Sequence, residues 1–293
     1  MNAGELNTDL EMLEWQISMG ADEAIGDEAV DWFAASAASM KAKAAANSIP
    51  KPTVPDRPAL LNRPQTQTNV AKAVTSSQDE VADARRLAAT CKTIDELIAA
   101  LETFDTCALS RTATNLCFID GNRDAKILII GEVPGRDEDL QGKPFVGRAG
   151  QLLDKMLDSI DLARKNDASE SSVLFSNTVF WRPPGNRKPT ESETLMCLPF
   201  VNKLIELMAP KMIVCLGAMP TQRLTGETKG INRLRGRWFD YNRPENGENA
   251  GQSRSSIPIL ATLHPSYLLL QPKLKKLAWR DLIAMKQKLM SII

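Results

Sequence analysis

The chain has 293 residues, 43% of them hydrophobic and 25% charged, with a formal net charge of zero, which is typical of a soluble globular protein. It contains no apolar run of the ~18 residues needed to span a membrane, and its first residues lack the basic start and apolar core of a signal peptide. Five scattered cysteines without a CxxC pair argue against a disulfide framework, so we expect a cytoplasmic protein that does not enter membranes.

Three segments follow one another along the chain. Residues 1–35 place apolar side chains at near-helical spacing between acidic residues, which predicts an amphipathic helical segment that could bind a protein partner. Residues 36–77 are rich in Ala, Ser, Pro and Gln, with too few large apolar side chains to offset the entropy of ordering. We therefore expect a disordered linker there, followed by one globular domain over residues 78–293.

Strands and helices alternate in the globular part. Capping-box sequences at Thr93–Glu96 and Thr190–Glu193 predict the starts of two helices. Core strands are expected at residues 126–131, 173–180, 211–216 and 257–262, an edge strand at 238–241, and further helices at 150–160, 218–224 and 274–290. This alternation predicts an α/β fold, a three-layer α/β/α sandwich around a mostly parallel four-stranded sheet.

Polar side chains suited to catalysis follow three of these strands. Glu132 comes directly after the first strand, Asn177 lies at the end of the second, and His264, the only histidine, follows the last. Each residue type alone is more often structural, as part of a turn or a satisfied core group. Because the carboxyl ends of parallel strands meet at one edge of a sheet, where ligands bind, we expect the three on adjacent strands around one pocket.

Four motifs, in this order, resemble the uracil-DNA glycosylases of the family-4 type. They are Gly-Glu-Val-Pro-Gly at 131–135, Gly-Lys-Pro-Phe-Val-Gly at 142–147, Ser-Asn at 176–177 ahead of Arg-Pro-Pro-Gly-Asn at 182–186, and His-Pro-Ser at 264–266. The resemblance covers roughly residues 100–290. It implies a DNA repair enzyme that flips uracil out of DNA and hydrolyses its N-glycosidic bond, leaving an abasic site.

The resemblance also implies roles for single residues. Gly131, Phe145, Asn177 and His264 would form the uracil pocket, with the Phe145 ring stacked on the base and the Asn177 amide matching its O4 and N3–H edge. His264 would donate a hydrogen bond to O2, where negative charge develops during cleavage. Glu132 would stabilise the positive charge of the sugar and orient the attacking water.

DNA contacts are implied for two loops and the start of a helix. The expected contact residues are Gly147, Arg148, Pro265, Ser266, Tyr267, Leu268 and Lys273, with Tyr267 and Leu268 as a wedge that fills the gap left by the flipped base. The alternative for residues 267–270 is the first turn of a buried helix. Residues 229–288 hold 12 Lys/Arg against 4 Asp/Glu, which suits a polyanion or, alternatively, a solvated helix face.

The family's iron–sulfur ligands are incomplete in this chain. Members of the family usually bind a [4Fe–4S] cluster through four cysteines, but only Cys107 and Cys197 stand at those positions, and Phe104 and Trp181 replace the other two. Because the cluster needs four ligands, we expect no metal and no cofactor, with the two aromatic rings filling the space. The alternative is a retained cluster. Leu270 also departs from the family, which tends to have Arg there.

Two other functions fit parts of this pattern. A module that binds uracil or an abasic site in DNA without turnover would use the same fold, but the intact Glu132, Asn177 and His264 favour an enzyme. A nucleotide-binding enzyme is disfavoured, because neither a GxGxxG loop nor a P-loop pattern occurs. We expect a monomer that acts on uracil-containing DNA at the nucleoid.

Overall fold

The structure, a computed structural model, describes residues 68–166, 168–241 and 256–292. The predicted helical segment of residues 1–35 and residues 36–67 of the predicted linker lie outside this range. Helix α3 spans Thr68–Thr90, so it begins within the segment that was predicted as a linker. The last proline before this helix is Pro64, and beyond it nothing in the backbone chemistry prevents a helix that is stabilised by contacts with a partner helix.

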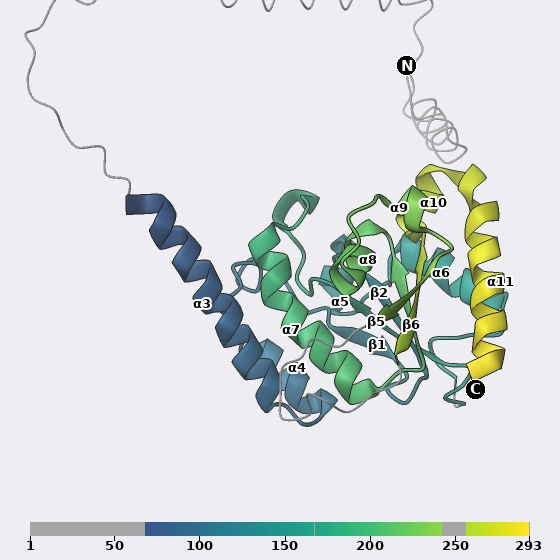
Figure 1. Cartoon of the computed structure of the whole chain (residues 1–293), viewed down its shortest axis with the longest axis horizontal. Helices are drawn as coiled ribbons and strands as arrows, with labels where there is room; N and C mark the ends of the chain where they lie inside the picture. Colours follow the sequence, from purple (N-terminus) through teal and green to yellow (C-terminus); the bar gives the residue numbers. More distant parts are fainter. Residues whose placement is uncertain (1–67, 167, 242–255, 293) are drawn as a thin grey trace, which may run out of the picture. The chain divides into compact units, whose positions relative to one another are not determined.

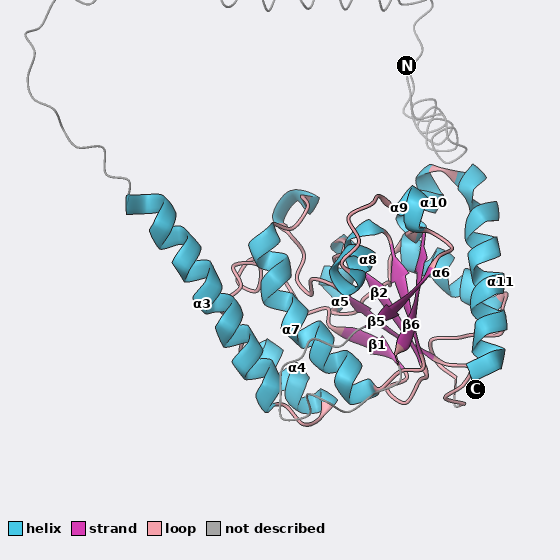
Figure 2. Cartoon of the chain, viewed as in Figure 1, coloured by secondary structure: helices cyan, strands magenta, loops and turns pink. Residues whose placement is uncertain are grey.

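One mixed sheet forms the centre of the domain (Figure 2). It has six strands in the order β1-β3-β2-β4-β6-β5. The four central strands are parallel, as predicted. The edge strands β1 and β5 are antiparallel to their neighbours; β5 was expected as an edge strand beside the four core strands, whereas β1 was missed. The strands are β1 (Ile119–Gly121), β2 (Ile127–Gly131), β3 (Val173–Asn177), β4 (Met212–Leu216), β5 (Trp238–Tyr241) and β6 (Ile257–Thr262).

Helices cover both faces of this sheet, which confirms the three-layer sandwich (Figure 1). On β2, Leu128 and Ile130 point into the core layer that contains residues of α4 and α7, whereas Ile127 and Ile129 point toward α6 and α11. This alternation follows from the twofold repeat of a strand. The helices after α3 are α4 (Ile94–Glu102), α5 (Arg136–Gln141), α6 (Arg148–Asp158), α7 (Glu191–Met208), α8 (Ala218–Thr225), α9 (Ile231–Leu234), α10 (Pro265–Leu270) and α11 (Lys275–Ile292).

The predicted helix starts at Thr93 and Thr190 are both present. Thr190 forms the complete capping box: its hydroxyl accepts from the Glu193 amide at 3.2 Å, and the Glu193 carboxylate accepts from the Thr190 amide at 2.7 Å. At Thr93 only the first bond forms, to the Glu96 amide at 3.1 Å. Among the described residues, no helix has the length and apolar character needed to cross a bilayer.

The strand order places a crevice at the end of β2. The chain leaves β2 to form β3 on one side and later returns to form β4 on the other side. Ligands of open α/β sheets bind at such switch points, outside the carboxyl ends of the strands. The residues that follow Ile130 therefore lie where the topology favours a site.

Candidate active site

The carboxyl ends of β2 and β3 bring Gly131 and Asn177 together. The two residues are register partners in the parallel pair. A Cβ atom on Gly131 would lie 2.5 Å from Asn177 Oδ1 and 2.4 Å from Phe145 Cζ, closer than any stable contact. Asn177 is 2% exposed, and its side-chain amide makes no hydrogen bond with the other described residues. Gly131 thus gives the amide and the phenyl ring room to meet, and the amide is available to a ligand.

Phe145 is held in an uncommon backbone conformation beside Gly131. Its φ angle is +57°, in the left-handed region that aromatic residues rarely adopt. A Cβ on Gly150 would lie 1.8 Å from the Phe145 carbonyl oxygen, so α6 can approach this residue only with a glycine there. Arg164 Nη2 donates to the same carbonyl at 2.7 Å. Such strain persists where the surroundings fix it, commonly at functional sites.

The Glu138 carboxylate connects the loop after β2, which contains Gly135, to the loop that contains Val146 and Gly147. Its Oε1 accepts hydrogen bonds from the amides of Val146 and Gly147 at 3.1 and 2.9 Å, and its Oε2 accepts from the amide of Gly135 at 3.1 Å. Three backbone donors on one carboxylate fix the loop after β2 against the loop that carries Phe145.

His264 reaches the same place from the end of β6. Its ring centroid lies 5.9 Å from that of Phe145, with a tilt of 32° between the rings. Strand β4 lies between β2 and β6, so the expectation that the three strands would be adjacent is wrong. The residue after β4 is Gly217, on which a Cβ would lie 3.6 Å from His264 Cβ. That distance is an ordinary contact, so the glycine is favoured here by its φ angle of +100° rather than by lack of space.

The protonation of His264 follows from its surroundings. Burial lowers the pKa of His264 to about 4, so the imidazole is neutral at physiological pH. Its Nδ1 accepts a hydrogen bond from the Ser266 amide at 3.2 Å, which places the proton of the neutral ring on Nε2. The side chain therefore presents one N–H donor to a ligand without carrying a charge.

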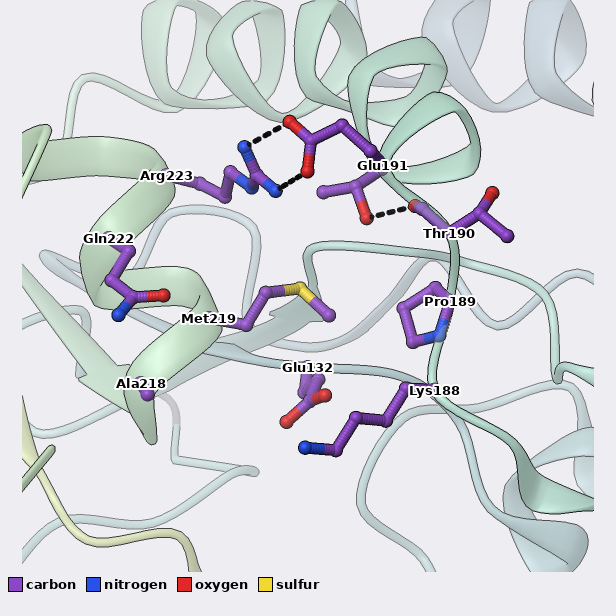
Figure 3. Close-up of a pocket in the computed structure, with 10 residues that line it drawn as sticks. Glu132, Lys188, Pro189, Thr190, Glu191, Ala218, Met219, Gln222 and Arg223 are labelled. Atoms are coloured by element: carbon purple, nitrogen blue, oxygen red, sulfur yellow. Dashed lines mark hydrogen bonds and ion pairs between the residues drawn. The ribbon is translucent and has the colours of Figure 1, made fainter. Parts of the chain in front are cut away.

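Glu132, the residue after Gly131, faces a cavity of about 230 Å³ whose lining does not include Phe145, Asn177 or His264 (Figure 3). The cavity is lined by the loop that contains Lys188 and by residues of α7 and α8. Burial raises the pKa of Glu132, and the positive charge of Lys188 opposes that rise. A carboxylate that is half-buried and faces one cation can stabilise a positive charge or accept a proton from water.

Comparison with known proteins agrees with this geometry. Residues 118–283, more than half of the chain, match the model of the uracil DNA glycosylase superfamily. The chain belongs to this superfamily. It is 34% identical over 189 residues to a type-4 uracil-DNA glycosylase of Archaeoglobus fulgidus, which covers 63% of this chain and 87% of the relative. A type-4 enzyme of Thermotoga maritima is 37% identical over 164 residues, covering 56% of this chain and 76% of the relative.

The predicted DNA contacts of this glycosylase-superfamily domain differ in exposure. Arg148, Ser266, Tyr267 and Lys273 are exposed. Leu268 is fully buried in a cluster with Leu263 and Ala278, as expected for the alternative of a buried helix turn; Gly147 and Pro265 are also buried. The exposed apolar side chains of α10 are Tyr267 (37%), Leu269 (37%) and Leu270 (76%).

The four positions that the resemblance assigns to cluster ligands, 104, 107, 181 and 197, contain two thiols and two rings. Cys107 and Cys197 are buried and hydrogen-bonded to each other, which lowers the pKa of Cys107, while burial raises that of Cys197. The rings of Phe104 and Trp181 are stacked with centroids 6.3 Å apart, and Phe104 meets Phe200 edge-on at 5.2 Å. This donor set does not fit a [4Fe–4S] cluster, because apolar packing occupies two of its ligand positions.

Sequence reasoning missed three residues of the site, Glu138, Arg164 and Lys188. Lys188 stands two positions after the Arg-Pro-Pro-Gly-Asn motif, which is a usable signal. Arg164 carries none: its guanidinium contacts the Phe145 carbonyl and lies 4.2 Å above the Phe175 ring, contacts that only the fold creates.

Proposed function

We propose that this protein is a uracil-DNA glycosylase that flips uracil out of DNA and hydrolyses its N-glycosidic bond, leaving an abasic site. The observation that carries the proposal is the meeting of Phe145, Asn177 and His264 around Gly131 at the end of β2, with Glu132 next in the chain. Superfamily membership and the type-4 relatives support the same activity.

Uracil recognition is assigned to the ring and the amide. An extruded base stacks on Phe145, which offsets part of the few kcal/mol that unstacking costs. The Asn177 side chain donates to uracil O4 and accepts from N3–H, whereas cytosine presents the opposite pattern of donor and acceptor. The slot therefore distinguishes uracil from cytosine by hydrogen bonding.

Cleavage is assigned to His264 and Glu132. As the bond between N1 and C1′ breaks, its electron pair moves into the uracil ring, and the Nε2–H of neutral His264 donates to O2 where charge develops. The sugar becomes positively charged, and the Glu132 carboxylate stabilises it and orients a water molecule that adds to C1′. The water proton passes to Glu132 and from there to solvent, and the uracil anion takes up a proton from solvent as it leaves, so the products are uracil and an abasic site.

DNA contacts are proposed for three places. They are the start of α6, through Gly147 and Arg148; the first turn of α10, through Pro265 and Ser266; and the segment after α10, through Lys273. Because Leu268 is buried, the wedge is assigned to Tyr267 with its exposed neighbours Leu269 and Leu270. We further propose that the enzyme is a monomer of the cytoplasmic nucleoid. Residues 78–293 would form the catalytic domain, and the helical segment before it would bind a protein partner.

The enzyme is also proposed to work without a cofactor. The stacked Phe104 and Trp181 rings support this, because they fill space that two cluster ligands would need. Iron analysis and the ~400 nm absorbance of purified protein test it, since a [4Fe–4S] cluster absorbs there and contains four irons. Stoichiometric iron in the purified chain would refute the proposal.

A gel assay separates the enzyme from a module that only binds. Labelled oligonucleotides that contain U:G, U:A or single-stranded uracil are incubated with protein and then treated with alkali, and a thymine-containing oligonucleotide of the same sequence is the control. The proposal predicts cleavage of the uracil substrates alone, with a rate that falls at least ~10²-fold in His264→Ala, as expected for loss of one oxyanion donor. A shifted but uncut uracil oligonucleotide would instead support the binding module.

A further inference from the structure

Glu132 needs a negative charge in a place that disfavours one. Burial raises the pKa of its carboxyl group, while the proposed chemistry requires a carboxylate beside a positively charged sugar. Some neighbouring positive charge must therefore compensate for the lost solvation. The charged residues that line the cavity with Glu132 are Lys188, Glu191 and Arg223.

Two of these three residues neutralise each other. Arg223 Nη1 donates to Glu191 Oε1 at 2.7 Å, and its Nη2 makes a second bond to the same carboxylate (Figure 3). Lys188 has no such partner among the described residues, and its amine lies beside the Glu132 carboxylate in Figure 3. Lys188 is thus the cation of this cavity that is free to act on Glu132.

The backbone around Lys188 is fixed by the helix start that follows it. Arg187 Nη1 donates to the Lys188 carbonyl at 3.0 Å, and the same guanidinium forms two bonds to Glu193, at 2.9 and 2.6 Å. Glu193 in turn closes the capping box on Thr190. The neighbouring arginine is therefore engaged with Glu193, and its bond to the Lys188 carbonyl holds the backbone from which the Lys188 side chain extends to the cavity.

We propose that Lys188 is a positioning residue of the glycosylase reaction, which holds the Glu132 carboxylate charged and in place across this cavity. The inference rests on the proposed role of Glu132. Lys188 is itself exposed, so solvent screens the pair, and exposed ion pairs contribute little. Its removal should therefore weaken the reaction in a pH-dependent way without abolishing it.

Single-turnover excision rates against pH test this with Lys188→Gln and Lys188→Arg. Lys188→Gln should match wild type on the alkaline plateau and fall about two- to fivefold below it on the acid limb, the range of an exposed ion pair. Lys188→Arg should restore the wild-type profile. Lys273→Gln is the matched control, because it removes a cation proposed to contact DNA; it should weaken DNA binding without moving the acid limb.

A second measurement keeps the inference testable if the protein proves not to cleave uracil. The carboxyl carbons of ¹³C-glutamate-labelled protein are titrated by NMR, and the Glu132 signal is assigned as the one lost in Glu132→Gln. The Glu132 midpoint should move to higher pH in Lys188→Gln and return in Lys188→Arg. An unchanged midpoint in Lys188→Gln would overturn the inference, whereas absent cleavage by the wild type would overturn only the proposed function.

Discussion

Replacing Gly131 by alanine should inactivate the glycosylase with little effect on its fold. The added Cβ would lie 2.4 Å from Phe145 Cζ and 2.5 Å from Asn177 Oδ1, where ordinary contact begins at 3.4 Å. Both side chains that are proposed to hold uracil must therefore move by about 1 Å. A misplacement of ~1 Å at a reacting group costs ~10²-fold in rate, and we expect a loss of at least this size.

The assay is single-turnover excision of uracil from a labelled duplex, with thermal unfolding measured on the same preparations. Both close contacts of the new methyl group are side chains that can shift, so destabilisation should stay within the ~1–3 kcal/mol typical of overpacking. Gly230→Ala is the control, because a Cβ there meets no atom within 4 Å. A Gly131→Ala protein that excises uracil at the wild-type rate would show that Gly131 does not border the uracil slot.

Three further changes probe the same site. Asn177→Asp loses the amide donor for uracil O4, so excision from uracil duplexes should disappear or shift weakly to cytosine; an undiminished uracil rate would remove Asn177 from recognition. The rate of uracil excision should fall as the pH drops through the pKa of Glu132, which burial raises. His264, with a pKa of about 4, stays neutral over that range. An excision rate that does not change at acid pH would contradict the role of the Glu132 carboxylate. Glu138→Gln leaves at least one of three loop amides without an acceptor and should cost ~1–3 kcal/mol in denaturant unfolding, whereas unchanged stability would show that other contacts hold the loop.

The central strands could be predicted because their apolar sequences match their buried positions in the sheet. Ile127–Ile130 and Met212–Leu216 are uninterrupted apolar runs that end at a glycine, and both are buried on two faces. Short apolar runs that end at a turn residue are typical of strands in the middle of a parallel sheet. By contrast, β1 is the three-residue segment Ile119–Gly121, half-buried throughout, and it becomes a strand only because β3 offers a free edge.

The candidate site was predictable in its residue types but not in its geometry. Glu132, Asn177 and His264 follow strands, and the rule for strand ends brings them to one edge. The sequence did not reveal that β4 separates two of these strands, since strand order depends on long-range packing. The sequence also showed no sign of the left-handed backbone conformation of Phe145, or of the hydrogen bond from Arg164, 19 positions later, to the Phe145 carbonyl.

A crystal structure with bound uracil would test directly whether Phe145, Asn177 and His264 form the uracil slot. Uracil should stack on the Phe145 ring, with its O4 and N3–H edge hydrogen-bonded to the Asn177 amide and its O2 within hydrogen-bonding distance of His264 Nε2. Uracil bound at another place, or bound in this slot with Asn177 and His264 both turned away from it, would show that these side chains do not form the uracil site.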